Sequence, residues 1–140
     1  MLILNQKTVN LFMQTRPTTN ELLHKLKAAT RAIQEKRVRF ANHPKIVGEL
    51  EGLNIDDSLE VWDLILDLLK EVKSDHYAGG HPPQPSNEKT IAGKDLWAFT
   101  WESTKLGKKM YLKFALKDDV FYYVSLHESR FPLKSKEVVK

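Results

Sequence analysis

Residues 108–127 carry three side chains whose types and spacing could support chemistry: Tyr111, Lys113 and His127. Cleavage of RNA without a metal ion needs a base for the 2′-hydroxyl group, an acid for the departing 5′-oxygen and positive charge for the phosphate between them. An imidazole can accept or donate the proton near neutral pH, and an ammonium group can hold the phosphate. We therefore take these three residues as the centre of a candidate ribonuclease site.

The three residues lie in two runs rich in Tyr, Phe, Val and Leu on either side of residues 117–119, which predicts a β-hairpin. A register that places Leu116 opposite Val120 collects the apolar side chains on one face, whereas a shift by one residue would move lysines into the core. The predicted buried face consists of Met110, Leu112, Phe114, Leu116, Val120, Tyr122, Val124 and Leu126. The predicted polar face consists of Lys109, Tyr111, Lys113, Phe121, Tyr123, Ser125 and His127.

In this register His127 lies opposite Lys109 and diagonal to Tyr111, so an imidazole, an ammonium group and a phenol meet on one rigid surface. An ordinary solvent-exposed face is the alternative, because half-exposed antiparallel sheets commonly carry Lys and Tyr on their solvent side. The sequence alone does not distinguish the two interpretations.

The proton-transfer roles can be assigned to residues of the right type. We predict His127 as one proton-transfer residue and either His76 or Glu102 as the other. Lys113 would hold the phosphate, and Tyr111 would orient it or stack on a base. The predicted substrate contacts are Lys109, Tyr77, Tyr123 and His81.

Residues 74–94 are rich in Gly, Pro, Ser and Asn, which predicts a long irregular loop. His76, Tyr77 and His81 stand at its start, beside a glycine pair that would let the backbone approach a ligand. Two histidines at this spacing do not form a metal-binding motif, so we predict no metal and no other cofactor. A metal-dependent nuclease with Asp75, Asp95 and Glu102 as ligands is a weaker alternative.

Composition limits the class of protein. The 140 residues include no cysteine, 41% hydrophobic residues and 29% charged residues, with a formal net charge of +4. These values predict one ordinary globular domain and exclude a disulfide framework or a thiolate metal site. Residues 1–4 form the longest apolar run near the N-terminus, too short for a signal or membrane segment, so we expect a cytoplasmic protein without a membrane partner. The positive charge favours acidic partners, either nucleic acid or protein.

Helices are expected before the sheet. Capping-box spacing from Thr18 to Glu21 and apolar residues at helical intervals predict a helix to about residue 35. Asn42 and Pro44 predict a second helix that ends near residue 52, and a third is expected over residues 57–72. Residues 36–40 read as a short strand or an extended link, and the four basic residues within 36–45 could contact phosphates.

Residues 96–102 alternate Trp97, Phe99 and Trp101 with smaller or polar side chains, which predicts a strand whose aromatic side chains face the helices. The expected fold is therefore α+β, with N-terminal helices packed on one face of a C-terminal antiparallel sheet of three or slightly more strands. We expect an irregular lead-in over residues 1–17, a single domain over residues 18–132 and a charged tail over residues 133–140.

Two short motifs are more particular. Met110-Tyr111-Leu112-Lys113, followed at hairpin distance by Val124-Ser125-Leu126-His127 and preceded by a Tyr-containing loop and Trp97, resembles the MqsR family of toxins from type II toxin–antitoxin pairs. That family is similar in turn to the RelE-like mRNA interferases. The resemblance covers residues 22–132 by element order, and by sequence mainly the last two strands. It implies a RelE-like fold and endoribonuclease activity on mRNA.

The resemblance assigns the family's catalytic tyrosine to Tyr111 and its lysine at the end of the last strand to His127. The family's loop lysine falls on Ala78, and the glutamine after its tryptophan falls on Ala98, so two functional side chains are absent here. The base specificity of the family therefore does not transfer unchanged.

The resemblance also implies an antitoxin protein as partner, of the kind that in related pairs binds operator DNA as a repressor. A non-catalytic RNA- or protein-binding module that uses the same basic face by stacking and charge is the alternative. A purely structural subunit would neither bind nor cleave nucleic acid.

Overall fold

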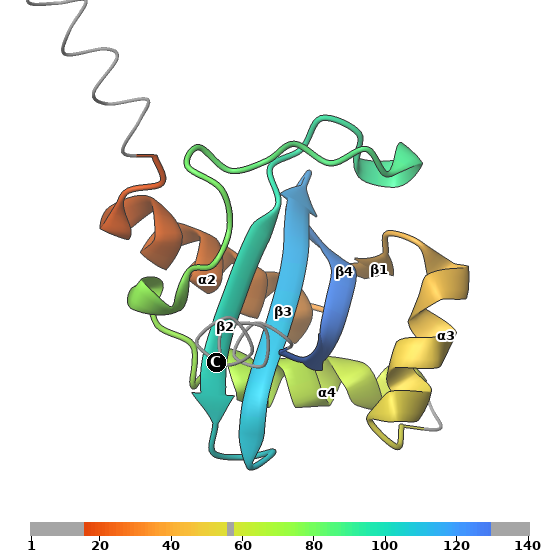
Figure 1. Cartoon of the computed structure of the whole chain (residues 1–140). Helices are drawn as coiled ribbons and strands as arrows, with labels where there is room; N and C mark the ends of the chain where they lie inside the picture. Colours follow the sequence, from red (N-terminus) through yellow and green to blue (C-terminus); the bar gives the residue numbers. More distant parts are fainter. Residues whose placement is uncertain (1–15, 56–57, 130–140) are drawn as a thin grey trace, which may run out of the picture.

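The computed structural model describes residues 16–55 and 58–129, and the structural statements below concern these residues. The expected tail over residues 133–140, most of the expected lead-in and the expected helix start at Asp57 lie outside them. The chain forms an α+β fold, as predicted, with helices behind a sheet and at one of its edges (Figure 1). The elements are α2 (Thr19–Gln34), β1 (Val38–Phe40), α3 (His43–Gly52), α4 (Ser58–Leu69), η1 (Ser74–His76), η2 (Lys89–Ile91), β2 (Trp97–Ser103), β3 (Lys108–Lys117) and β4 (Val120–Glu128).

The described part of the chain forms one sheet of four strands in the order β1-β4-β3-β2. The β2–β3 and β3–β4 pairs are antiparallel, whereas β1 runs parallel to β4. The sheet is therefore mixed, whereas an antiparallel sheet of three or slightly more strands was predicted. A strand as short as β1 gives too few residues for an alternating pattern to reveal its pairing partner.

The first predicted helix is confirmed as α2. The Thr18 hydroxyl caps it by accepting a hydrogen bond from the Glu21 amide at 3.1 Å. Its buried side chains recur at helical intervals and belong to the same core cluster as residues of the sheet. These side chains are Leu22, Leu26, Ala29, Ala32 and Ile33. Leu23, the remaining leucine of α2, is 45% exposed.

The second predicted helix is confirmed as α3, capped by the Asn42 side chain and with Pro44 in its first turn. It stands beside β1 and β4 at one edge of the sheet, whereas α2 and α4 lie behind the sheet (Figure 1). No helix in residues 16–55 or 58–129 combines the length and apolar character needed to cross a membrane.

The three aromatic residues of β2 enter the main core, as predicted. Trp97, Phe99 and Trp101 are almost completely buried among side chains from α2, α4 and β3. The Trp101 indole donates a 2.9 Å hydrogen bond to the carboxylate of Glu71, so its one polar atom is satisfied inside the fold.

The β3–β4 hairpin forms with a register that differs from the predicted one. Lys117, rather than Leu116, pairs with Val120, and an irregularity between Lys113 and Phe114 leaves Val124 as an extra residue in β4. A β-bulge of this kind reverses the faces of the residues beyond it. Phe121 and Tyr123 consequently point into the core, which corrects their predicted place on the polar face.

Two neighbouring residues that were predicted in the core also lie on the other face of the sheet. Tyr122 and Val124 pack on the opposite face of the sheet, in a second, smaller apolar cluster. The buried members of that cluster are Ala41, Ile91, Ala115 and Val124. The loop over residues 77–96 supplies Ile91, so this part of that face is covered rather than exposed to solvent.

Candidate functional site

The side of the sheet away from α2 and α4, here called the open face, brings together the two residues on which the chemical hypothesis depends. Tyr111 pairs with His127 on β4, and Thr100 of β2 lies on the other side of Tyr111. The phenol and imidazole rings stack with centroids 5.1 Å apart and planes inclined by 22°. The predicted juxtaposition is confirmed, and the rings are directly opposite rather than diagonal.

Lys113 lies one step along the same face of β3. Its Nζ atom is 6.0 Å from the centre of the Tyr111 ring, within reach of a cation–π interaction. Burial, and then the positive charge of Lys45, lower the pKa of the Lys113 ammonium group, with Glu49 acting in the opposite direction. Burial raises the pKa of the Tyr111 phenol. Both side chains are therefore partly shielded from water.

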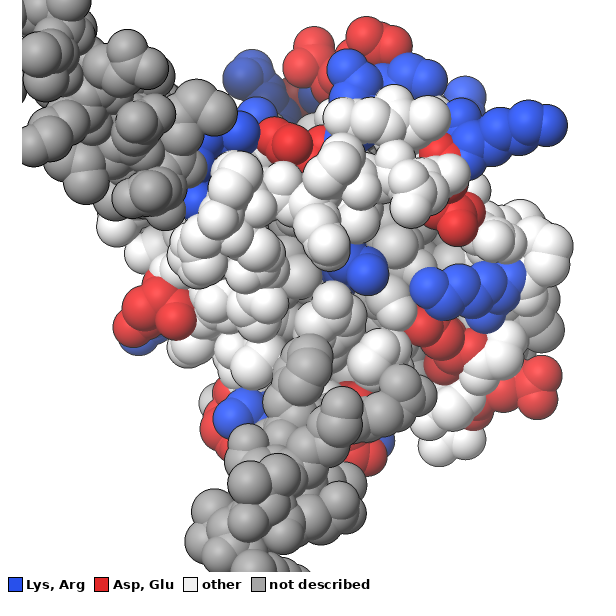
Figure 2. Space-filling view, turned by 45° about the horizontal axis from the view of Figure 1, so that its top comes forward, with Lys and Arg blue, Asp and Glu red and all other residues white. Residues whose placement is uncertain are grey.

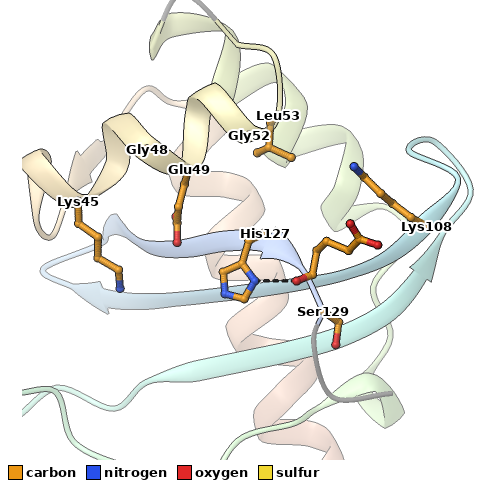
Figure 3. Close-up of a pocket in the computed structure, with 9 residues that line it drawn as sticks. Lys45, Gly48, Glu49, Gly52, Leu53, Lys108, His127 and Ser129 are labelled. Atoms are coloured by element: carbon orange, nitrogen blue, oxygen red, sulfur yellow. Dashed lines mark hydrogen bonds between the residues drawn. The ribbon is translucent and has the colours of Figure 1, made fainter. Parts of the chain in front are cut away.

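The imidazole of His127 has a defined orientation. Its Nδ1 atom lies 2.8 Å from the backbone carbonyl oxygen of Glu128, a contact drawn in Figure 3. A carbonyl oxygen can only accept, so Nδ1 carries the hydrogen in this arrangement. The Nε2 atom of the neutral ring is then the proton acceptor.

A hollow of about 590 Å³ lies beside His127, between α3 and the ends of β3 and β4 (Figure 3). Lys45 and Lys108 lie on opposite sides of the imidazole in that view. The lining residues are Lys45, Gly48, Glu49, Gly52, Leu53, Lys108, His127, Glu128 and Ser129. The hollow and the Tyr111–His127 pair thus share one residue, His127.

Glu49 of α3 holds the outer edge of β4 beyond the end of β1. Its carboxylate accepts hydrogen bonds from the Tyr123 hydroxyl at 2.7 Å, the Ser125 hydroxyl at 2.7 Å and the Leu126 amide at 3.0 Å. If β1 were longer, one of its carbonyl groups would accept the hydrogen bond from the Leu126 amide. The Glu49 carboxylate accepts it instead. Burial and the hydrogen bond to Glu49 raise the pKa of Tyr123.

Lys109 and Glu102 lie opposite each other on β3 and β2. Because Lys109 is two residues from Tyr111, both share the open face with it, as predicted. β3 lies between Glu102 and His127, so Glu102 is next to Lys109 rather than next to the imidazole.

The site residues that were predicted in the loop over residues 74–94 lie away from His127. Tyr77 forms a β-bridge with Phe99 at the outer edge of β2, and His76 caps the preceding turn by accepting the Lys73 amide hydrogen at 2.9 Å. β2 and β3 separate this edge from His127. The structure therefore does not bring His76 to His127, and the predicted choice between His76 and Glu102 loses its geometric basis.

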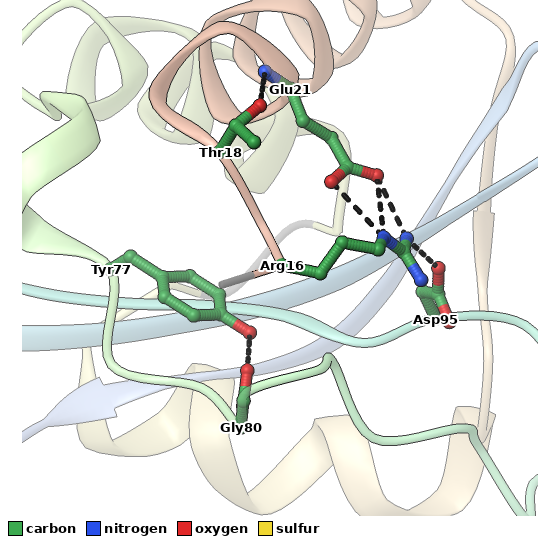
Figure 4. Close-up of polar contacts among 6 residues, drawn as sticks. All are labelled: Arg16, Thr18, Glu21, Tyr77, Gly80 and Asp95. Carbon is green, nitrogen blue, oxygen red and sulfur yellow. Dashed lines mark hydrogen bonds and ion pairs between the residues drawn. The ribbon is translucent and has the colours of Figure 1, made fainter. Parts of the chain in front are cut away.

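Tyr77 lies near Arg16, just before α2 (Figure 4), and His81 contacts Tyr77. Their rings make an edge contact at 5.3 Å, and the Tyr77 hydroxyl donates a hydrogen bond to the Gly80 carbonyl. Burial raises the pKa of Tyr77 to about 12. Nearby, Arg16 bonds to Glu21 at 2.8 Å and to Asp95 at 2.9 Å. These contacts tie the irregular loop to α2, so these residues have an evident structural role.

Asp95 is engaged by Arg16, whereas Asp75 lies at η1 and Glu102 on the open face. Among residues 16–55 and 58–129, no set of three or more His, Asp or Glu side chains is placed to hold a metal ion. The proposed ligand set of Asp75, Asp95 and Glu102 is thus not assembled in the described part of the chain.

Tyr123, predicted as a substrate contact, is completely buried. Its ring contacts Phe40 and Trp62 in the main core. The reason is the bulge at Val124, which the alternating pattern does not reveal.

Two residues of α3 near the site had no assigned role in the sequence. Lys45 was one of four basic residues with no distinguishing feature, and Glu49 had no signal because its partners on β4 are more than seventy residues away. Only the packing of α3 against β4 reveals either one.

On the face that Figure 2 shows, Lys and Arg side chains of the described residues lie close to Asp and Glu rather than in one extended basic area. On that face, individual lysines therefore attract an anionic ligand more than the net charge of +4 does. A comparison of the chain with protein-family models, curated proteins and solved structures finds no match.

Proposed function

We propose that this protein is an endoribonuclease that cleaves single-stranded RNA without a metal ion. The observation that carries the proposal is the stacked Tyr111–His127 pair on the open face, with the Lys113 ammonium group beside it. These are the group types that the reaction requires, on rigid strands rather than on a loop.

In the proposed reaction, Nε2 of His127 takes the proton from a ribose 2′-hydroxyl group. The 2′-oxygen attacks the adjacent phosphorus, and the bond from phosphorus to the 5′-oxygen breaks. The products are a 2′,3′-cyclic phosphate and a 5′-hydroxyl end.

Lys113 is proposed to hold the phosphate and to protonate the departing 5′-oxygen. Its lowered pKa makes its ammonium group a better acid than an ordinary lysine, whereas the raised pKa of Tyr111 makes the phenol a poorer one. Tyr111 then has the positioning role, with its ring against the imidazole. Lys109 extends the positive charge along the strand.

The biological context is proposed from the resemblance to the MqsR family and, through it, to the RelE-like interferases. An mRNA-cleaving toxin requires a neutralising antitoxin, and a chain with net charge +4 suits a partner with an acidic surface. Suppression of toxicity by the product of an adjacent reading frame would test this partnership directly.

The decisive experiment is the cleavage of a labelled mixed-sequence RNA by the full chain in excess EDTA. We expect cleavage with 2′,3′-cyclic phosphate ends, and we expect His127→Ala to reduce the rate by about 10²- to 10⁴-fold. His81→Ala is the matched control, because that exposed imidazole lies at the other edge of the sheet. Wild-type rates from both His127→Ala and Tyr111→Phe would overturn the assignment, and full-length RNA in every reaction would favour the binding module.

A further inference from the structure

The hollow beside His127 has a wall that lacks side chains. Gly48 and Gly52 are one helical turn apart on α3, and both line the hollow (Figure 3). A Cβ atom added to either glycine would meet no atom within 4 Å beyond its chain neighbours and the backbone of its own helix. The absence of side chains here is therefore not required by packing of the described residues, although glycine weakens a helix.

A bare helix wall suits a flat ligand. Glycines commonly stand where a ligand approaches the backbone closely, and Leu53 adds an apolar surface at the end of the same wall. The volume of about 590 Å³ falls in the range typical of small-molecule sites, about 300–1,000 Å³. A nucleobase is the planar part of the substrate proposed above.

Cationic side chains stand on both sides of the hollow. Lys45 and Lys108 flank the hollow, and Lys113 is close enough to Lys45 for the two charges to interact. A strand that places its reacting phosphate at His127 would therefore meet positive charge on both sides as its base turns into the hollow.

One carboxylate in the lining has no hydrogen bond or ion pair to another described residue, that of Glu128, whereas both oxygens of Glu49 already accept hydrogen bonds. A carboxylate can only accept, so it favours a base whose edge carries an amino group over uracil, whose single N3–H donor is flanked by two carbonyl oxygens that repel the carboxylate.

We propose that the hollow between α3 and the ends of β3 and β4 is a nucleobase subsite, which receives an amino-bearing base next to the cleaved phosphodiester. This inference rests on the ribonuclease function proposed above and adds to it a determinant of sequence preference.

The glycine wall provides the test. Gly48→Leu fills the hollow without meeting another atom at Cβ, and leucine favours the helix, so the melting temperature should stay the same or rise by a few degrees. KM for RNA should rise by about tenfold or more, as expected for the loss of a bound base, while kcat changes much less. Gly48→Ala should have a smaller effect of the same kind. Glu51→Leu is the matched control, since this exposed residue of α3 does not line the hollow.

A second measurement tests the base preference. Short RNAs that differ only in the base on either side of one cleavable bond should show uracil as the poorest base at one of these positions. Glu128→Gln should weaken this discrimination, because an amide can also donate to the carbonyl groups of uracil. Equal use of all four bases at both positions would overturn the assigned chemistry of the subsite.

The possible results distinguish a failure of the proposed subsite from a failure of the proposed ribonuclease function. If the wild type cleaves RNA and Gly48→Leu does so with an unchanged KM, the subsite is wrong and the ribonuclease stands. If the wild type binds RNA without cleaving it and Gly48→Leu loses that binding, the ribonuclease is wrong and the subsite stands. If RNA is bound but uncut and Gly48→Leu binds it equally well, or if the wild type neither binds nor cleaves, both are wrong.

Discussion

The two halves of β4 have opposite arrangements. In the half that pairs with β1, the odd-numbered residues Phe121 and Tyr123 are buried in the main core. In the half beyond Val124, the odd-numbered residues Ser125 and His127 lie on the open face. One extra residue between the halves accounts for the change, because each additional residue in a strand reverses the side to which its successors point.

A single strand, β4, thus contributes to both the core and the candidate site. The first half contributes aromatic rings against Phe40 and Trp62, which anchor the strand. The second half, anchored in this way and held at its edge by Glu49, presents His127 at the hollow. The bulge at Val124 thus determines which side chains of β4 reach the core and which reach the candidate site.

Deletion of Val124 should have the largest effect. Without the extra residue, one half of β4 must turn its core residues outward, so that either Phe121 and Tyr123 or Leu126 would leave the core. Exposure of buried side chains of this size should destabilise the protein by more than about 4 kcal/mol, which is enough to unfold many domains. Urea-induced unfolding followed by circular dichroism would measure the change.

Val124→Ala is the control for that deletion, because it keeps the number of residues and therefore the register. It removes only two buried methyl groups, so the free energy of unfolding should fall by about 1–2 kcal/mol. If the deletion were no more harmful than this substitution, the bulge would not determine the two faces.

Much of this fold could be predicted from local pattern. The Thr18 cap, the helical spacing of α2 and the alternating aromatic residues of β2 involve neighbours in the sequence, and the structure confirms each. The hairpin was also predictable, but its bulge was not. An extra residue leaves the composition of a strand unchanged and is detected only through the partners on either side.

The candidate site was predictable to a similar extent. Tyr111 and His127 share a face in both the predicted and the observed register, because the two registers differ by two residues at that point and the side-chain period is also two. Tyr123, beyond the bulge, differs by one residue and was assigned to the wrong face. Glu49 depends on the packing of α3, which no local pattern encodes.

Glu49→Ala should have the next largest effect, because it removes the acceptor that holds the second half of β4. The Tyr123 and Ser125 hydroxyl groups and the Leu126 amide would each lose a bond. Unpaired buried donors of this kind should lower the free energy of unfolding by about 2–4 kcal/mol. Hydrogen exchange at the Leu126 amide should also accelerate.

Glu51→Ala is the matched control on the same helix, since Glu51 is exposed, and it should change stability by less than about 0.5 kcal/mol. Equal effects of the two substitutions would show that Glu49 does not hold the strand.

The smallest expected effect distinguishes the tyrosines on the two faces. Tyr123→Phe removes one hydrogen bond to Glu49 and should lower the free energy of unfolding by about 1–2 kcal/mol at neutral pH, with little change in RNA cleavage. Tyr111→Phe should do the reverse, because it removes the hydroxyl group that is proposed to orient the phosphate and keeps the ring that stacks on His127. Denaturant unfolding and RNA cleavage assays of both variants would measure the two effects, and a Tyr123→Phe variant that lost cleavage but kept its stability would contradict the assignment of faces.

The stability difference between wild type and Tyr123→Phe should also depend on pH, with a sign fixed by the raised pKa of Tyr123. Below the ordinary value of 10.0, the phenol is neutral in both the folded and the unfolded chain, so its full contribution to stability is present. Above that value the unfolded chain ionises while the folded chain resists, because burial and the Glu49 carboxylate disfavour the phenolate, and wild-type stability falls. The variant has no group to ionise at this position. Its deficit relative to wild type should therefore shrink as the pH rises from about 8 to about 11 in urea unfolding experiments, and a deficit that stayed constant or grew would place Tyr123 outside the core.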